Sequence, residues 1–431
     1  MSLDEAAEPE TEIAVPGVPL HDPYAVLRMP NFRLYLAGNA LAIFGVQMQT
    51  VAVGWEIYER THEPLDLGLV GLVQFLPIGV LTLPAGQVAD LLNRKLIIMA
   101  SMLALACCSL GLSWISAREG AVIWMYVCLL ASGVARAFLQ PAKSSFLPQI
   151  VPREQFATAV TWNMGAFHLA AVVGPAAGGF LIGWLKRATE VYLLDAAATL
   201  TFFVMLAFIK SARHAPAREA VRWRTFLAGA EFVWSNKVIL GAMTLDMFAV
   251  LLGGAVALLP AYAKDILDVG PTGLGWMQAA PAVGALLMSF VLAHRPPIER
   301  AGPAMLWTVA GFGAATIVFG FSRSFMLSLA MLFLTGAFDT VSVVIRHTLV
   351  QLLTPDEMRG RVSAINGMFI GASNELGRFE SGLVAAWLTP LGSVVSGGVG
   401  TLVVVAAVAT LWPQLGRYGR LDGKTGEEGQ V

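Results

Sequence analysis

The chain has 431 residues, 56% of them hydrophobic and only 13% charged, and its formal net charge is −1. A soluble domain averages about 25% charged residues, and a soluble chain this apolar could not cover its surface with polar side chains. The near-neutral charge and the lack of a basic stripe exclude a nucleic-acid partner. The composition therefore indicates an integral membrane protein.

The two ends of the chain are polar. The first segment, 1–31, is acidic and contains Asp4, Glu5, Glu8, Glu10 and Glu12. A signal peptide begins with basic residues, so we predict that 1–31 is a disordered cytoplasmic tail. The polar segment 414–431 is predicted to be a second cytoplasmic tail.

Between these tails the chain is built of long apolar segments. A helix that crosses a bilayer needs about 20 apolar residues, and twelve segments meet this requirement. In chain order they are 34–57, 66–90, 96–116, 121–142, 158–184, 190–209, 238–263, 270–293, 303–321, 325–349, 362–388 and 391–413. They predict an N-terminal six-helix bundle over 32–209 and a C-terminal one over 238–413. The segment 210–237 is basic and then amphipathic, which predicts a cytoplasmic linker with an interfacial helix.

The basic residues predict the orientation. Most of the 28 Lys and Arg residues fall in segments that face the cytoplasm when both tails do, and Lys143 and Arg346 are counted among them. The positive-inside rule therefore places both termini in the cytoplasm, in a multi-pass protein of the cytoplasmic (inner) membrane. Arg136 and Arg378 instead fall inside predicted spans.

The two predicted bundles resemble each other in sequence. At an offset of about 203 residues, Gly133 falls on Gly336 and Asn163 on Asn366, and further identities follow at nearly the same offset. An even number of helices separates the copies, so they have the same orientation. The predicted fold is all-α, with twelve transmembrane helices in two parallel six-helix repeats. Such repeats are typical of transporters whose substrate site lies at the midplane between the halves.

Two motifs carry a resemblance to a known family. The stretch GQVADLLNRK (86–95) is similar to the loop signature G-x-x-x-D-R-x-G-R-[RK] of the major facilitator superfamily, with departures at Leu91 and Asn93. The matching residues are Gly86, Asp90, Arg94 and Lys95. In that family this loop closes the cytoplasmic side through charge contacts, so the resemblance implies a gate here.

The second motif, GPAAGG (174–179), resembles the family's antiporter signature G-P-x-x-G-G through Gly174, Pro175, Gly178 and Gly179. The proline bends a helix and the glycines allow a neighbouring helix to approach closely. The resemblance covers about residues 30–413. The stretches GWEIYERT (54–61), TPDEMRGRVSAI (354–365) and SNELGRFESG (373–382) are similar to the branch that holds the enterobactin exporter and macrolide efflux proteins, which implies export of an amphiphilic small molecule.

Charged residues inside predicted spans are candidates for function, because a charge at mid-bilayer costs at least about 2.5–3.5 kcal/mol. Glu375 and Arg378 are three residues apart and share a helix face. One hypothesis is that Glu375 exchanges a proton in the central cavity and Arg378 adjusts its affinity. The alternative is a structural ion pair. Glu380 lies nearer the outer interface and is predicted to be solvated or structural.

Other mid-span charges offer alternative sites. Asp246 and Asp339 are predicted as alternative proton or cation sites, and Arg136 occupies the repeat position of Asp339. Arg136 has two interpretations: it holds Asp90 or another acid near the cytoplasmic gate, or it anchors an anionic substrate. Glu56 and Asp195 lie near outer helix ends, where acids are commonly solvated or capping.

Neutral polar residues complete the set of candidates. Four glutamines are candidates for the substrate cavity, with interhelical hydrogen bonding as the alternative: Gln47, Gln49, Gln74 and Gln278. The sequence contains no phosphate-binding loop, catalytic elbow or metal-ligand motif, so no enzyme activity, cofactor or metal is predicted. The favoured prediction is a monomeric secondary transporter that exports a small amphiphilic molecule, such as a drug or siderophore, in exchange for protons by a rocker-switch mechanism. The alternatives are an importer or uniporter of a polar nutrient, or a membrane sensor that does not transport.

Overall fold

The computed structural model describes residues 22–210, 223–296 and 298–419. The predictions for the remaining parts of the two tails and for 211–222 of the linker lie outside these residues. The described residues form helices joined by short connections, and none of them is in a strand. Helical structure begins before residue 32, with a 3-10 turn at Ala25–Arg28.

The first group of helices corresponds to the first six predicted spans. Its members are α1 (Pro30–Thr61), α2 (Pro64–Leu91), α3 (Arg94–Ala117), α4 (Val122–Ile150), α5 (Phe156–Leu185) and α6 (Thr189–Phe208). Helix α1 packs against α5 and α6, α3 packs against α4 and α6, and α2 packs against α4. The connections are tight. His62 after α1 and Lys186 after α5 both adopt left-handed backbone conformations.

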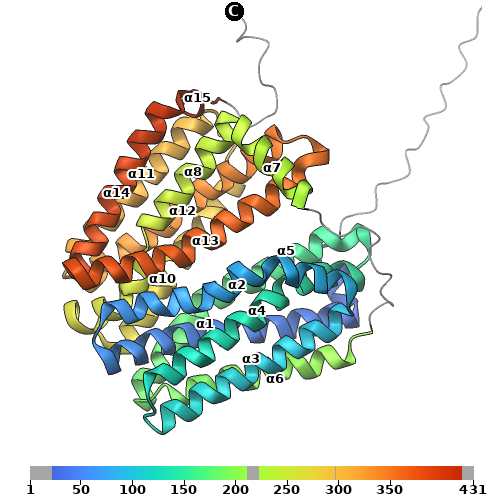
Figure 1. The fold of residues 1–431 in the computed structure, drawn as a ribbon, viewed down its shortest axis with the longest axis vertical. Coiled ribbons are helices and arrows are strands. Elements are labelled where there is room, and N and C mark those ends of the chain that lie inside the picture. The colour runs from blue at the N-terminus through green and yellow to red at the C-terminus, as the bar shows by residue number, and fades with distance from the viewer. Residues whose placement is uncertain (1–21, 211–222, 297, 420–431) are drawn as a thin grey trace, which may run out of the picture.

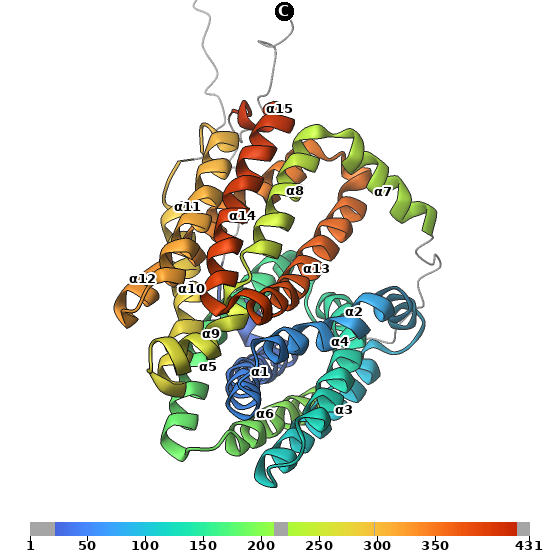
Figure 2. The ribbon, with the colours of Figure 1, turned by 60° about the vertical axis from the view of Figure 1, so that its left-hand side comes forward.

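The second group repeats this pattern. It consists of α8 (Lys237–Leu252), α10 (Gly270–Ala293), α11 (Ala301–Phe321), α12 (Phe325–Leu353), α13 (Asp356–Leu388) and α14 (Pro390–Leu411). The short helix α7 (Trp223–Ser235) lies in the predicted linker and packs against α13 and α8. Figures 1 and 2 show the two groups as separate bundles, with α2 beside α13 and α5 beside α10.

The seventh predicted span is broken in the structure. Helix α8 ends at Leu252, and a 3-10 turn, the short helix α9 (Leu259–Ala261) and a π-helical turn (Tyr262–Ile266) continue the segment. A Cβ at Gly254 would lie 2.5 Å from the carbonyl oxygen of Gly377, which is closer than real Cβ atoms approach. Gly254 thus lets α13 approach the backbone where the helix unwinds.

Eleven of the described helical segments are long and apolar enough to cross a membrane. The long helix that this set omits is α13, which carries Glu375, Arg378 and Glu380. With α13 included, the helices correspond to the twelve predicted spans. The helix that is least suited to lipid by composition is therefore the one that carries the charges singled out in the sequence.

Candidate functional site

The two helix groups are in backbone contact at one end of the molecule. A Cβ at Gly179 of α5 would lie 2.3 Å from the carbonyl oxygen of Pro271 and 2.8 Å from Cα of Gly275, both on α10. A Cβ at Gly382 of α13 would lie 2.6 Å from Cα of Gly68 on α2. Such crossings are possible only where both helices carry glycine or other small residues.

The same helices separate towards their other ends. An added Cβ would meet nothing within 4 Å at Gly86 of α2, Gly165 of α5, and Gly367 and Gly371 of α13. Gly86, Gly165 and Gly367 lie in the parts of their helices nearer the end at which α1 begins and α14 ends, and Gly371 lies in the middle of α13. The interface between the halves is therefore closed at one end and open at the end that carries both ends of the described chain (Figure 1).

Side chains reinforce the closed end. The hydroxyl of Tyr58 on α1 donates to the carboxylate of Asp265 in the π-helical turn. Lys264 lies with its Nζ 3.9 Å from Oε1 of Glu59, whose other oxygen accepts a hydrogen bond from Nε1 of Trp55 at 2.9 Å. We call the contacts of Tyr58 and Glu59 with Asp265 and Lys264 the latch. The sequence analysis missed it, because the partners lie about two hundred residues apart.

The glycines of the antiporter-like motif contact two different helices. A Cβ at Gly174 would lie 2.6 Å from Cβ of Gln47 on α1, and one at Gly178 would lie 3.0 Å from Cα of Met48 on the same helix. Gly179 instead faces the other half, as described above. The motif therefore packs α5 against a partner within its own half and against a helix of the opposite half.

Glu375 and Arg378 form an ion pair on α13, with Arg378 Nη1 3.4 Å from Glu375 Oε2. A Cβ at Gly71 of α2 would lie 2.9 Å from Cβ of Arg378, so the pair sits where α13 leaves its contact with α2. The Arg378 and Glu375 side chains are 39% and 26% exposed. The pair is therefore partly accessible and self-neutralised.

Arg136 on α4 faces this pair from the opposite half. Its Nη1 donates to Oε1 of Gln74 on α2 at 3.1 Å, and its charge interacts with Glu375, Arg378 and Asp195. The structure thus brings together four of the predicted site residues, from α2, α4 and α13. Of the other predicted partner, Asp90, only the backbone is described, within α2.

Asp246 and Asp339 have different environments. Asp246 forms a buried ion pair with Arg346 of α12, whose side chain is 2% exposed. Arg346, counted with the cytoplasmic segments in the sequence, lies within α12 and is buried. Asp339 is two helical turns from Arg346 and interacts electrostatically with both partners. Among the described residues, it forms no hydrogen bond or ion pair. Together with Asn374 and Arg378 it lines a cavity of about 200 Å³.

Asp195 is not a solvated helix-end acid. It is 2% exposed, and its Oδ2 accepts a hydrogen bond from Ser109 Oγ of α3 at 2.5 Å. Gln49 of α1 donates to the same hydroxyl at 2.9 Å. The other carboxylate oxygen, Oδ1, is buried without a partner in the described structure. Asp195 therefore joins three helices in the interior of the first half.

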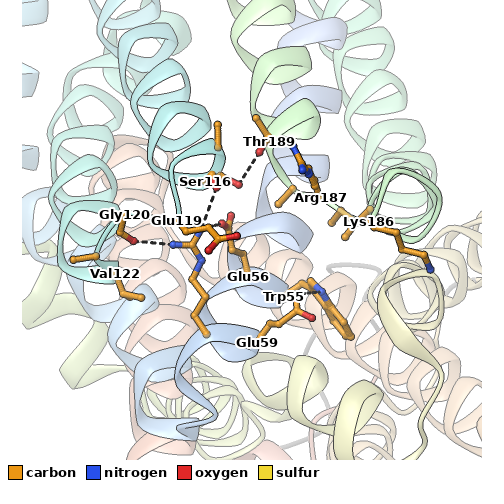
Figure 3. Close-up of a pocket in the computed structure, with 15 residues that line it drawn as sticks. Trp55, Glu56, Glu59, Ser116, Glu119, Gly120, Val122, Lys186, Arg187 and Thr189 are labelled. Atoms are coloured by element: carbon orange, nitrogen blue, oxygen red, sulfur yellow. Dashed lines mark hydrogen bonds and ion pairs between the residues drawn. The ribbon is translucent and has the colours of Figure 1, made fainter.

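Glu56 is also buried, at 6% exposure, and forms an ion pair with Arg60 one turn later. Arg60 donates to the carbonyl oxygen of Gly120 at 2.8 Å. These residues line a pocket of about 510 Å³ at the closed end, between α1 and the connections that follow α3 and α5 (Figure 3). The predicted solvated or capping role of Glu56 is wrong, because its side chain is buried and its Oε1 is paired with Arg60.

Two cations of the loop signature donate hydrogen bonds to carbonyl oxygens near the ends of other helices. Arg94 Nη1 donates to the carbonyl oxygen of Ser145 at 3.0 Å. Lys95 Nζ donates to the carbonyl oxygens of Ala207 and Ile209, at 2.9 and 2.8 Å. Cations suit these positions, because the carbonyl end of a helix carries partial negative charge. In this conformation both cations hold helices of the first half together at the open end.

The glutamines do not form one group. Gln49 and Gln74 hydrogen-bond to Ser109 and Arg136, as above. Gln47 and Gln278 are half-buried and form no hydrogen bond among the described residues. Sequence reasoning also missed Lys143, which it assigned to a cytoplasmic segment. Lys143 lies inside α4, and its Nζ donates to Oδ1 of Asn39 at 2.7 Å.

Comparisons with known proteins identify the family. The family model "Major Facilitator Superfamily" matches residues 35–377. The chain is 25% identical over 396 residues to the enterobactin exporter EntS of Escherichia coli O1:K1, covering 90% of this chain and 93% of that protein.

Solved structures share the fold. A bacterial homologue of the human lysosomal transporter Spinster matches with a TM-score of 0.69 at 14% identity, over 94% of this chain and all of the other. A bacterial homologue of the iron transporter ferroportin also has a TM-score of 0.69 and 14% identity, over 91% of this chain and all of the other. The chain belongs to the Major Facilitator Superfamily and is a multi-pass membrane transporter, not an enzyme.

Proposed function

We propose that this transporter exports a small amphiphilic molecule across the cytoplasmic membrane in exchange for protons, as a monomer with both termini in the cytoplasm. The direction is supported by the likeness to an enterobactin exporter along 90% of the chain. The orientation is supported by the distribution of Lys and Arg residues, which follows the positive-inside rule. In this orientation the open end faces the cytoplasm, where an exported molecule enters.

The inward-open state is supported by the glycine contacts. The two crossings, at Gly179 with Gly275 and at Gly68 with Gly382, lie at the end opposite the termini. The structural relatives named above include proteins solved in inward-facing conformations. Alternating access then requires the crossings to separate while the ends near Gly86 and Gly367 approach one another, as in a rocking motion of two parallel repeats.

The single observation that supports proton coupling best is Asp339. Its carboxyl group lies in mid-span, lines a cavity, and has no hydrogen-bond or ion-pair partner among the described residues. An unpaired charge inside a membrane protein is costly, so an acid there is expected to bind a proton or a cation. Asp246 is a weaker candidate because Arg346 already neutralises it.

Glu375 is the second proposed proton site. Its partner Arg378 and the facing cation Arg136 lie on different halves. A rocking motion changes the distance from Glu375 to Arg136 but not to Arg378, which is on the same helix. The charge environment of Glu375 therefore depends on the state of the transporter, as coupling requires.

The test is efflux from a pump-deficient host that expresses this chain. Cationic dyes, macrolides and catecholate siderophores are loaded, and export is measured with and without a protonophore. We expect protonophore-sensitive export that is lost in Asp339→Asn and reduced in Glu375→Gln. The matched control is Asp356→Asn at an exposed helix start, which should export normally. Normal export by both test variants at equal expression would refute this assignment of the proton sites.

A further inference from the structure

Lys143 on α4 presents its ammonium group to side chains of α1 and α6. Its Nζ lies 2.7 Å from Oδ1 of Asn39 on α1 and 5.1 Å from the ring centre of Phe202 on α6. The amide of Asn39 donates in turn to Oδ1 of Asn163 on α5, at 2.8 Å. No acidic side chain pairs with Lys143 in the described part of the chain.

The second half neutralises its corresponding cation. In the sequence repeat, Lys143 falls on Arg346, which forms its buried ion pair with Asp246 on α8, the first helix of that half. In the first half, the first helix supplies the neutral amide of Asn39 instead. The two halves therefore hold a cation at equivalent repeat positions, and among the described residues only Arg346 has an acidic partner.

The described groups around Lys143 supply no acidic partner for it. Arg136, two turns away on α4, is a second cation that interacts with it. Asp195 of α6 is engaged by Ser109 of α3, and α1 and α5 contribute the two asparagines. An amide oxygen and an aromatic ring stabilise an ammonium group without neutralising it. A net positive charge thus remains inside the membrane region, where it is costly unless a ligand compensates it.

The ammonium group of Lys143 also has hydrogen-bond donors that are not used in the described structure. An ammonium group has three donors, and Lys143 uses one for a hydrogen bond in the described structure. The side chain is half-buried. It lies between Arg136 and the end of α4 at Ile150, and at Gly165, two residues after Asn163 on α5, an added Cβ would meet nothing within 4 Å.

We propose that Lys143, with Asn39 and Asn163, binds the anionic group of an amphiphilic substrate, such as a carboxylate, a catecholate or a sulfonate. The inference rests on the proposed export function and adds its substrate class. Lys143 supplies the charge, and the side-chain amides orient the anion. The site belongs to the first half alone, since Arg346, at the repeat position of Lys143, is already paired with Asp246 in the second half.

Binding of two dyes that share a xanthene scaffold tests the inference. Purified protein in phosphatidylcholine nanodiscs is titrated with anionic fluorescein and cationic rhodamine 123, and fluorescence anisotropy is recorded. We expect wild-type protein to bind fluorescein more tightly than rhodamine 123. Lys143→Met should weaken fluorescein binding about tenfold or more, whereas Lys143→Arg should stay within about threefold. Lys186→Met, an exposed lysine at the closed end, is the matched control and should change nothing.

Other outcomes overturn the inference. It fails if the wild type shows no preference for fluorescein, or if Lys143→Met and Lys186→Met bind it equally well. It also fails if phosphatidylglycerol in the nanodisc abolishes fluorescein binding, because a lipid headgroup then occupies the site. Asn163→Leu provides a second variant should Lys143→Met not fold, and it should weaken fluorescein binding several-fold with the charge retained.

The result is separate from the test of the proposed function, because binding is measured without a proton gradient. Loss of fluorescein binding in Lys143→Met, combined with efflux that a protonophore does not affect, would retain the anion site and reject proton antiport. The reverse combination would retain antiport and reject the anion site.

Discussion

Arg346 on α12 and Asp246 on α8 form a buried ion pair inside the second half, with side-chain exposures of 2% and 5%. Each residue alone would be an unpaired charge in a region with little water. Together they join the first and fourth long helices of this half. The pair also gives Asp246 an environment that differs from that of Asp339, because Asp339 has no such partner among the described residues.

This pairing predicts unequal effects of single and double substitutions. Asp246→Leu and Arg346→Met should each destabilise the protein by about 3–5 kcal/mol, because each leaves one charge buried and unpaired. The double variant should recover most of that loss. Thermal unfolding, monitored by size-exclusion chromatography of the purified protein, measures the stability of all three variants. Single variants as stable as the wild type would show that the pair is not buried in the membrane protein.

Asp195 is predicted to tolerate loss of charge better than loss of polarity. Asp195→Asn keeps an oxygen that accepts from Ser109, so stability should change little. Asp195→Leu removes the carboxylate that accepts from the buried hydroxyl of Ser109, and should cost about 1–3 kcal/mol. The same unfolding assay compares the two variants. Equal losses in both would indicate that the negative charge itself is required.

The glycine crossings are predicted to control closure of the outer end. Gly179→Ala adds a Cβ at 2.3 Å from the carbonyl oxygen of Pro271, so α5 and α10 must move apart. We expect a marked loss of export at normal expression. Gly165→Ala lies on the same helix in open space and, as the control, should gain up to about 1 kcal/mol of helix stability with export retained. Equal export by both variants would contradict the importance of this crossing.

The latch is predicted to hold the inward-open state. Tyr58→Phe removes the hydroxyl that donates to Asp265, a hydrogen bond to a charged group worth about 1.5–3 kcal/mol. The closed end should then open more often. Thr272→Cys, placed at the crossing in a background without native cysteines, reports this opening through its labelling rate with an impermeant maleimide added outside. We expect faster labelling in Tyr58→Phe, and an unchanged rate would show that this hydrogen bond does not keep the end closed.

The sequence predicted the helices well because the bilayer restricts length and composition. A segment of about 20 apolar residues has few alternatives to a spanning helix, and the twelve predicted segments correspond to long helical segments in the structure. The seventh predicted segment differs from the others, because its helix is broken at Gly253–Gly254. That break depends on α13 lying against it, a contact that no local pattern records.

The partners of the buried charged residues could not be predicted from the sequence. Lys143 and Arg346 were assigned to cytoplasmic segments because both lie near the polar ends of apolar runs. Helices α4 and α12 each have 29 residues, so these cations lie well inside them. Glu56 and Asp195 were misplaced for the related reason that distance along a helix does not show which face is covered by neighbours.

The sequence by itself determined the class of protein, the number of helices and the internal repeat, because these follow from the spacing of apolar and identical residues along the chain. Only the tertiary structure decided which charges neutralise each other, which end of the interface is closed, and that Lys143 has no counter-charge in the described protein. Those properties depend on contacts between helices far apart in sequence, where a shift of one residue changes the face of a helix and therefore its partner.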